Sequence, residues 1–118
     1  MKSFVYIFLL AMVTTGFSQE IKPTVTLQND GSILATFFHK NGKVAQQGSL
    51  VNDKRHGEWI SYDENGIKTI QAEYTMDLKT GKWFFWKKDE LIEVDYRNNQ
   101  IASVNTWIDK DAIAGNRP

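Results

Sequence analysis

The chain has 118 residues with 14 basic and 14 acidic side chains, so its formal net charge is zero, and 42% of its residues are hydrophobic. This length predicts one domain. The balanced charge argues against a protein that binds nucleic acid through massed phosphate contacts, which need an excess of Lys and Arg. Because the sequence has no Cys, disulfides, cysteine nucleophiles and cysteine zinc ligands are excluded.

The first residues have the pattern of a secretory signal peptide. Lys2 is followed by an unbroken apolar run at residues 4–13 and by small residues at Gly16 and Ser18. A positive start, a short apolar stretch and a small-x-small cleavage site are typical of such a signal. The alternative is an uncleaved membrane anchor, but a spanning helix needs about 20 apolar residues. We therefore expect residues 1–18 to be removed and the protein to be exported, to a periplasm or outside the cell.

A first hairpin is predicted at the start of the exported chain. Residues 24–27 and 33–38 favour strands, and they flank Asn29-Asp30-Gly31, a sequence typical of a turn. We expect residues 19–34 to form an N-terminal strand and cap.

Residues 35–108 repeat at an interval of about 24 residues. Asn41-Gly42 recurs as Asn65-Gly66, and Gly57 recurs as Gly81. Two aromatic columns have the same interval: Trp59, Trp83 and Trp107, and Phe38, Tyr62 and Trp86. Such a period indicates a repeat architecture.

Each unit has the features of a β-hairpin. In the unit at residues 59–82, residues 59–62 favour a strand, and Asn65-Gly66 supplies the positive φ angles of a tight turn. Residues 70–76 then alternate between apolar and polar side chains, as in a half-buried strand. Chained hairpins of this kind predict an all-β fold, a repetitive antiparallel β-hairpin meander in a single sheet. We expect the polar tail at residues 109–118 to be flexible.

The motifs at residues 52–66 (NDKRHGEWISYDENG) and 80–86 (TGKWFFW) resemble MORN-type repeats, and most of all the variant found in YwqK-like antitoxin-family proteins. In that pattern a Gly precedes a Trp by two residues, an aromatic residue follows, and Asn-Gly closes the hairpin. The resemblance implies a repetitive antiparallel sheet without enzyme chemistry. Roles of such repeats include protein–protein contact and membrane association, and the family name implies an antitoxin.

The aromatic columns are either core or binding surface. In Trp83-Phe84-Phe85-Trp86 four aromatic residues are consecutive, so both faces of that strand are aromatic, whereas a lone antiparallel sheet commonly has one solvated face. An exposed aromatic patch marks a binding surface. The candidate partner-binding residues are Trp59, Tyr62, Trp83, Phe84, Phe85, Trp86, Lys87 and Lys88.

Motifs for catalysis or metal binding are absent from the sequence. It contains neither GxSxG nor GxxxxGK[ST]. His39 and His56 do not form a spaced ligand motif, and we expect His56 to be solvated. Glu93 and Asp95 share one strand face, whereas a glycosidase needs its two carboxylates across a pocket. We therefore expect no enzyme activity, no cofactor, no metal and no small-molecule substrate.

The function expected from the sequence is non-catalytic binding of a protein partner at the cell envelope. One alternative is association with a membrane surface through aromatic residues and Lys87-Lys88. Another is an antitoxin-like inhibitor of a partner protein.

Overall fold

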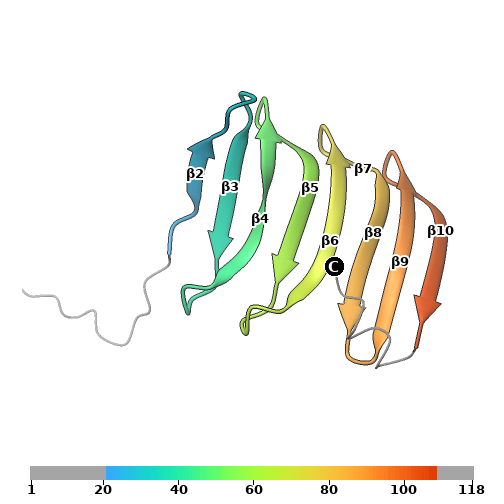
Figure 1. Cartoon of the computed structure of the whole chain (residues 1–118). Coiled ribbons are helices and arrows are strands. Elements are labelled where there is room, and N and C mark those ends of the chain that lie inside the picture. Colours follow the sequence, from blue (N-terminus) through green and yellow to red (C-terminus); the bar gives the residue numbers. More distant parts are fainter. Residues whose placement is uncertain (1–20, 109–118) are drawn as a thin grey trace, which may run out of the picture.

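The computed structural model describes residues 21–108, and these form one antiparallel sheet (Figure 1). The strands are β2 (Thr24–Leu27), β3 (Ile33–Phe38), β4 (Val44–Val51), β5 (Lys54–Tyr62), β6 (Lys68–Thr75), β7 (Leu78–Lys79), β8 (Gly81–Lys87), β9 (Glu90–Arg97) and β10 (Gln100–Trp107). The predicted signal peptide and the predicted flexible tail lie outside the described residues.

The strands follow one another across the sheet in the order of the sequence. The order is β10-β9-β8-β6-β5-β4-β3-β2, and the short β7 pairs with β6. Every pair is antiparallel, and Figure 1 shows a single open layer. The predicted all-β hairpin meander is thereby confirmed. Within residues 21–108, no helix has the length and apolarity that crossing a membrane requires.

The two-residue turns in which both residues have positive φ lie at the end of the sheet opposite to the one predicted. Two-residue turns with positive φ at both positions are formed by Asn52-Asp53, Met76-Asp77 and Asn98-Asn99. At Asn65-Gly66, by contrast, only the glycine has positive φ. The Asp63 carboxylate accepts hydrogen bonds from the backbone N–H groups of Asn65 (2.9 Å) and Ile67 (3.0 Å). The expected tight Asn-Gly hairpin is therefore wrong, because this aspartate organises a wider loop.

Hydrogen bonds between turns join successive hairpins. The backbone N–H of Asp77 donates to the carbonyl of Arg55 (2.8 Å), and the Arg55 N–H donates back to the Asp77 carboxylate (2.8 Å). Asn99 and Lys79 repeat this reciprocal pair at 2.9 and 2.8 Å. The turns at Met76-Asp77 and Asn98-Asn99 are therefore fixed to the start of the preceding unit.

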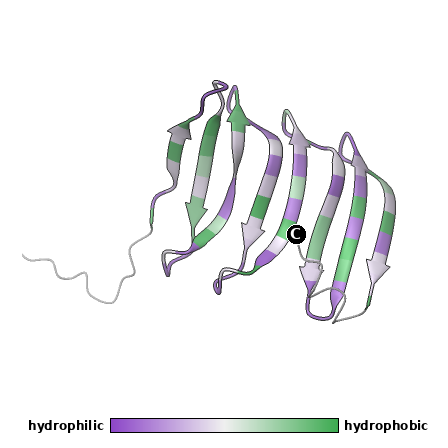
Figure 2. Cartoon of the chain, in the orientation of Figure 1, coloured by the Kyte–Doolittle hydropathy of each residue, from purple (hydrophilic) through white to green (hydrophobic). Residues whose placement is uncertain are grey.

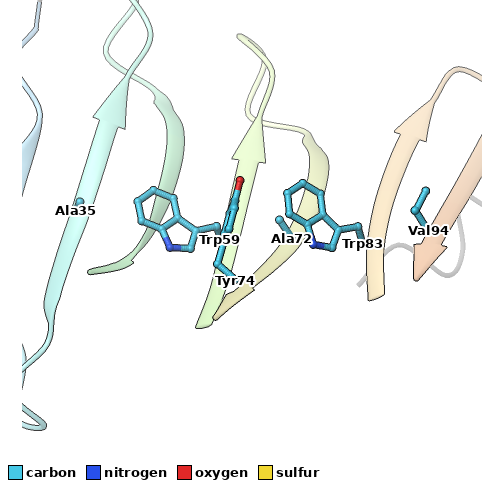
Figure 3. Close-up of a cluster of buried hydrophobic side chains, with 6 residues drawn as sticks. All are labelled: Ala35, Trp59, Ala72, Tyr74, Trp83 and Val94. Carbon is cyan, nitrogen blue, oxygen red and sulfur yellow. The ribbon is translucent and has the colours of Figure 1, made fainter. Parts of the chain in front are cut away.

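One face of the sheet is filled by aromatic rings that contact one another across the strands. We call these five residues the aromatic ladder, and they are Phe37, Trp59, Tyr74, Trp83 and Tyr96. Successive ring centroids are 6.4, 6.4, 5.1 and 5.2 Å apart. Ala35, Ala72 and Val94 complete the buried cluster on this face, part of which is drawn in Figure 3.

The indole rings lie flat enough to be buried without a second layer. A Cβ added to Gly48 would meet Trp59 Cδ2 at 2.1 Å, so the Trp59 ring occupies the space above that glycine. The Trp59 Nε1 donates to the carbonyl of Ser49 (3.0 Å), and the Trp83 Nε1 donates in the same way to the carbonyl of Glu73 (2.9 Å). Both rings therefore lie back over the preceding strand.

Trp107 does not continue the column of Trp59 and Trp83, which corrects the prediction. It pairs with Leu91, which pairs with Trp86, whereas Val104 pairs with Val94, the partner of Trp83. The reason is loop length, because residues 88–89 join β8 to β9 where the longer segment 63–67 joins β5 to β6. Trp83 and its partner Val94 are therefore 11 residues apart, whereas Trp59 and its partner Ala72 are 13 apart. The third residue of the shift arises between β9 and β10, where the register shifts between Ile101 and Ser103, and Val104 takes the place expected for Trp107.

Candidate functional site

The candidate residues divide between the two faces of the sheet. Successive residues of a strand point to opposite faces, and cross-strand partners share a face. Trp59, Trp83 and Phe85 therefore lie on the ladder face. Tyr62, Phe84 and Trp86 lie on the opposite face, where Phe84 and Trp86 stack with centroids 5.9 Å apart.

On the ladder face, the candidates are part of the core. Trp59 and Trp83 are 3% and 6% exposed, and Phe85 is half-buried against the cluster. Cationic side chains also cover the rings: Arg55 Cζ lies 4.2 Å from the centroid of Tyr74, and Lys79 Nζ lies 5.2 Å from that of Trp83. Such contacts stabilise the ladder. Trp59 and Trp83 thus present little side-chain surface to a partner.

The opposite face carries a second row of aromatic residues. We call it the aromatic band, and it consists of Tyr62, Phe84, Trp86 and Trp107. Trp107 joins it because Trp107, Leu91 and Trp86 are in register. Trp86 is buried and Trp107 is 45% exposed, while Tyr62 and Phe84 are half-buried. The band therefore has accessible surface at both of its ends.

Charged groups surround the aromatic band. Lys68 Nζ lies 5.8 Å from the ring centroid of Trp86. Lys82 Nζ is 2.7 Å from the Glu93 carboxylate, and this hydrogen bond raises the pKa of Lys82. Lys87 and Lys88 are exposed at the hairpin end directly after Trp86. In Figure 2 the sheet mixes hydrophobic and hydrophilic residues along its strands, without one apolar block.

A shallow pocket adjoins the band at Tyr62. It has a volume of about 520 Å³ and lies between two hairpin ends, lined by Gly42, Lys43, Val44, Gln47, Tyr62 and Gly66. Its lining has no carboxylate, imidazole or other acid–base group except the phenol and the lysine. The pocket is therefore suited to contact with a side chain of a partner more than to a reaction.

The two histidine side chains form hydrogen bonds with the backbone of neighbouring hairpins. His39 Nε2 is 2.8 Å from the carbonyl oxygen of Tyr62, and His56 Nδ1 accepts a 3.2 Å hydrogen bond from the N–H of Met76. His56 is half-buried, so the expectation that it is solvated is wrong. Within residues 21–108, no group of three His, Asp or Glu residues is placed to hold a metal ion.

Comparison with known families identifies the repeat unit. Residues 33–52 and 55–75 match the model of the MORN repeat variant. The two matches cover the β3–β4 and β5–β6 hairpins. A search of curated proteins gives no match. The resemblance of the sequence to MORN-type repeats is confirmed at this level, and the relation to YwqK-like antitoxins stays a prediction.

The MORN repeat variant is a non-catalytic unit, and its geometry continues beyond the matched residues. Trp83 donates to the carbonyl of Glu73 as Trp59 donates to that of Ser49. In both cases the acceptor lies ten residues before the donor. The β8–β9 hairpin is therefore a third structural copy whose connecting loop is shorter.

Sequence reasoning missed three parts of the site. Arg55 and Lys79 cover the ladder, and Trp107 belongs to the band. The shorter spacing of the third unit was a signal for Trp107, because it changes the residue that faces each partner. Arg55 and Lys79 recur at the 24-residue interval of Trp59 and Trp83, so the repeat relates the two cations, although it does not show that they lie over rings.

Proposed function

We propose that this protein is an exported, non-catalytic binding module that contacts a protein partner at the cell envelope through its aromatic band. The observation that carries the proposal is the different burial of the aromatic rings on the two faces of the sheet. On the ladder face Trp59, Tyr74 and Trp83 are buried, the last two beneath cations, and Phe37 is 38% exposed. On the opposite face the band has a buried Trp86 with half-buried Tyr62 and Phe84 and exposed Trp107 around it.

The composition of the band supports a protein as the partner. Aromatic residues are enriched where proteins bind one another, and partly buried rings in a firm surface need little ordering on binding. The adjoining pocket at Tyr62 can accept one side chain of the partner. Exposed lysines at the hairpin end favour a partner surface with carboxylates.

A cross-linking pull-down from native envelope tests the proposal. The wild type is compared with Tyr62→Ala/Phe84→Ala, which truncates the band, and with Phe37→Ala, which removes a 38% exposed ring from the other face. We expect one protein to be recovered by the wild type and by Phe37→Ala, and lost with the double variant. Equal recovery by all three, with each variant folded, would contradict the proposal.

Export rests on residues 1–18 and is tested separately. The protein is expressed from the full-length sequence and collected in the form that the cell accumulates. We expect its mass to correspond to a chain that starts at Gln19. Retention of the first 18 residues in a membrane fraction would instead support an uncleaved anchor.

Association with a membrane surface is the second candidate function. It is favoured by the position of Lys87 and Lys88, which are exposed beside the end of the band. The expected result is co-sedimentation with vesicles that rises with anionic lipid and falls with salt. Lys87→Gln/Lys88→Gln should abolish it. An antitoxin-like inhibitor differs from the first candidate only in the identity of the partner, which the pull-down provides.

A further inference from the structure

The two outer strands of the sheet differ in how open they are to further pairing. Within residues 21–108, β2 pairs with β3 alone and β10 with β9 alone. β2 is four residues long and directly follows Pro23, which has no N–H to offer. β10 is eight residues long. A short strand next to a proline is a protected edge, and β10 lacks both protections.

β10 also lacks the charges by which proteins discourage pairing at a sheet edge. Its sequence, QIASVNTW, contains no Lys, Arg, Asp, Glu or Pro, and each of its residues is exposed. Long, uncharged edge strands are templates for another strand. β10 therefore has the features of an edge strand that pairs with another strand through backbone hydrogen bonds.

Apolar side chains on β10 continue the core beyond the edge. On the ladder face, Val104 extends the row of Trp83 and Val94 and is 53% exposed, and Ile101 lies beside Tyr96 and is 60% exposed. An added strand would bury these side chains if its own residues on that face were apolar. The partner strand must therefore be uncharged and carry apolar residues on the ladder face.

We infer that β10 pairs in antiparallel orientation with β10 of a second copy of this chain, around a two-fold axis perpendicular to the sheet. Such an axis keeps both ladder faces on one side, so Val104 and Ile101 of each copy extend one common row. A second copy supplies the required strand by itself. Pairing of β10 with β2 would instead build an open-ended array on the shorter, proline-flanked edge.

Electrostatics permits this contact. Among residues 21–108, the nearest acidic side chains, Glu93 and Asp95, stand on β9, so in the dimer those of the two copies are three strand spacings apart, about 14 Å. This distance exceeds the screening length of about 10 Å at 0.1 M salt. Glu93 is also paired with Lys82. Within the described residues, no like charges face one another across the two β10 strands.

Sedimentation equilibrium of the purified protein over a range of concentrations tests the inference, with Asn105→Lys as the variant. Asn105 pairs with Glu93 on β9, so a lysine there suits the folded monomer, but in the dimer it puts two lysines, one from each copy, on the same face of the paired β10 strands. We expect a dimer for the wild type and a dissociation constant at least about tenfold higher for the variant. Thr26→Lys, which puts the same charge on β2, is the matched control and should dimerise normally.

Mixing charges makes the test specific to β10. The Asn105→Glu variant alone should also dimerise more weakly than the wild type, and an equimolar mixture of it with Asn105→Lys should form dimers again. A monomeric wild type at all concentrations would overturn the inference. The inference would also be overturned if Thr26→Lys weakened dimerisation as much as Asn105→Lys does. Failure of the equimolar mixture to form dimers would overturn it too. Tyr62 and Phe84 lie on β5 and β8, away from β10, so Tyr62→Ala/Phe84→Ala should dimerise like the wild type.

Discussion

At the scale of single residues, the same residue type has different roles on the two faces. Trp59 and Trp83 are buried and donate hydrogen bonds to the preceding strand, whereas Trp107 is nearly half exposed at the edge. Residues 21–108 form a single layer, so the sheet obtains burial from rings that lie on neighbouring strands, with Gly48 leaving space for one of them. The cost of a substitution therefore depends on the face and strand, not on residue type.

Trp83→Ala should lower the free energy of unfolding by about 3–5 kcal/mol, because it removes a buried ring and leaves a cavity in the ladder. Trp107→Ala is the matched control and should cost less than about 1 kcal/mol, since its ring is 45% exposed. Urea denaturation followed by far-UV circular dichroism, at a concentration where the protein is monomeric, measures both. Similar losses for the two variants would show that the ladder is not the core.

Asp77 should make the free energy of unfolding depend on pH in the acidic range. The backbone N–H and the guanidinium of Arg55 donate to its carboxylate and hold its pKa below the ordinary value of 3.8. Its stabilisation is therefore present above that value and is lost as the pH falls through the folded-state pKa. Asp77→Asn tolerates the positive φ but loses the charge. We expect it to be less stable than the wild type at pH 7, with a difference that shrinks below about pH 4.

Urea midpoints of both proteins at pH 7 and pH 3 measure this effect. A difference between them that is unchanged at pH 3 would contradict the role assigned to the carboxylate charge.

At the scale of elements, the hairpins are joined by their turns as well as by their strands. Asp77 with Arg55, and Asn99 with Lys79, form the same reciprocal hydrogen bonds between a tight turn and the start of the preceding unit. Asp77 and Asn99 both have a φ of 72°. Turn residues therefore determine how consecutive repeats stack.

Substitutions of Asn99 should separate the contribution of its side-chain hydrogen bond from that of its tolerance of positive φ. Asn99→Ala loses the bond to the Lys79 N–H and also strains a backbone with φ of 72°, so it should cost about 2 kcal/mol. Asn99→Gly relieves the strain and should cost roughly half as much. Thermal or urea denaturation of the two variants checks this order. Equal stability of both with the wild type would mean that the turn contact is unimportant.

At the scale of the whole molecule, the sheet is elongated, with extents of 65 × 36 × 26 Å. Each strand pairs only with its neighbours in the order of the sheet. In such a structure stability is nearly a sum of local and nearest-neighbour contributions. The buried aromatic residues lie on β5, β6 and β8, so the middle of the sheet holds most of the stabilising burial.

Native-state hydrogen exchange should reflect the concentration of burial in the middle of the sheet. In dilute protein we expect the amides of β2 and β10 to exchange fastest and those of β5, β6 and β8 slowest. Raising the protein concentration should slow exchange in β10 and leave β2 unchanged if β10 pairs with a second copy. Uniform protection across all strands would contradict the nearest-neighbour description.

Much of this architecture was predictable from local sequence. Alternating strands, turn residues and the 24-residue interval of Trp59 and Trp83 follow from residues close together in the chain, and such local signals suffice when every strand pairs with its sequence neighbour. The face occupied by Trp107 was not predictable, because it depends on loop length and a bulge between Ile101 and Ser103 that accumulate along the sheet.

The sequence by itself determined the repeat, the meander and the aromatic character of both faces. Only the tertiary structure decided which aromatic residues are core. Arg55 and Lys79 each precede a ladder Trp by four residues and share the 24-residue interval, but that interval does not show that their side chains cover the rings. Trp86 is buried although it lies on the other face. Burial depends on what lies above a ring in three dimensions, and on a single-layer sheet that is decided by long side chains from neighbouring strands.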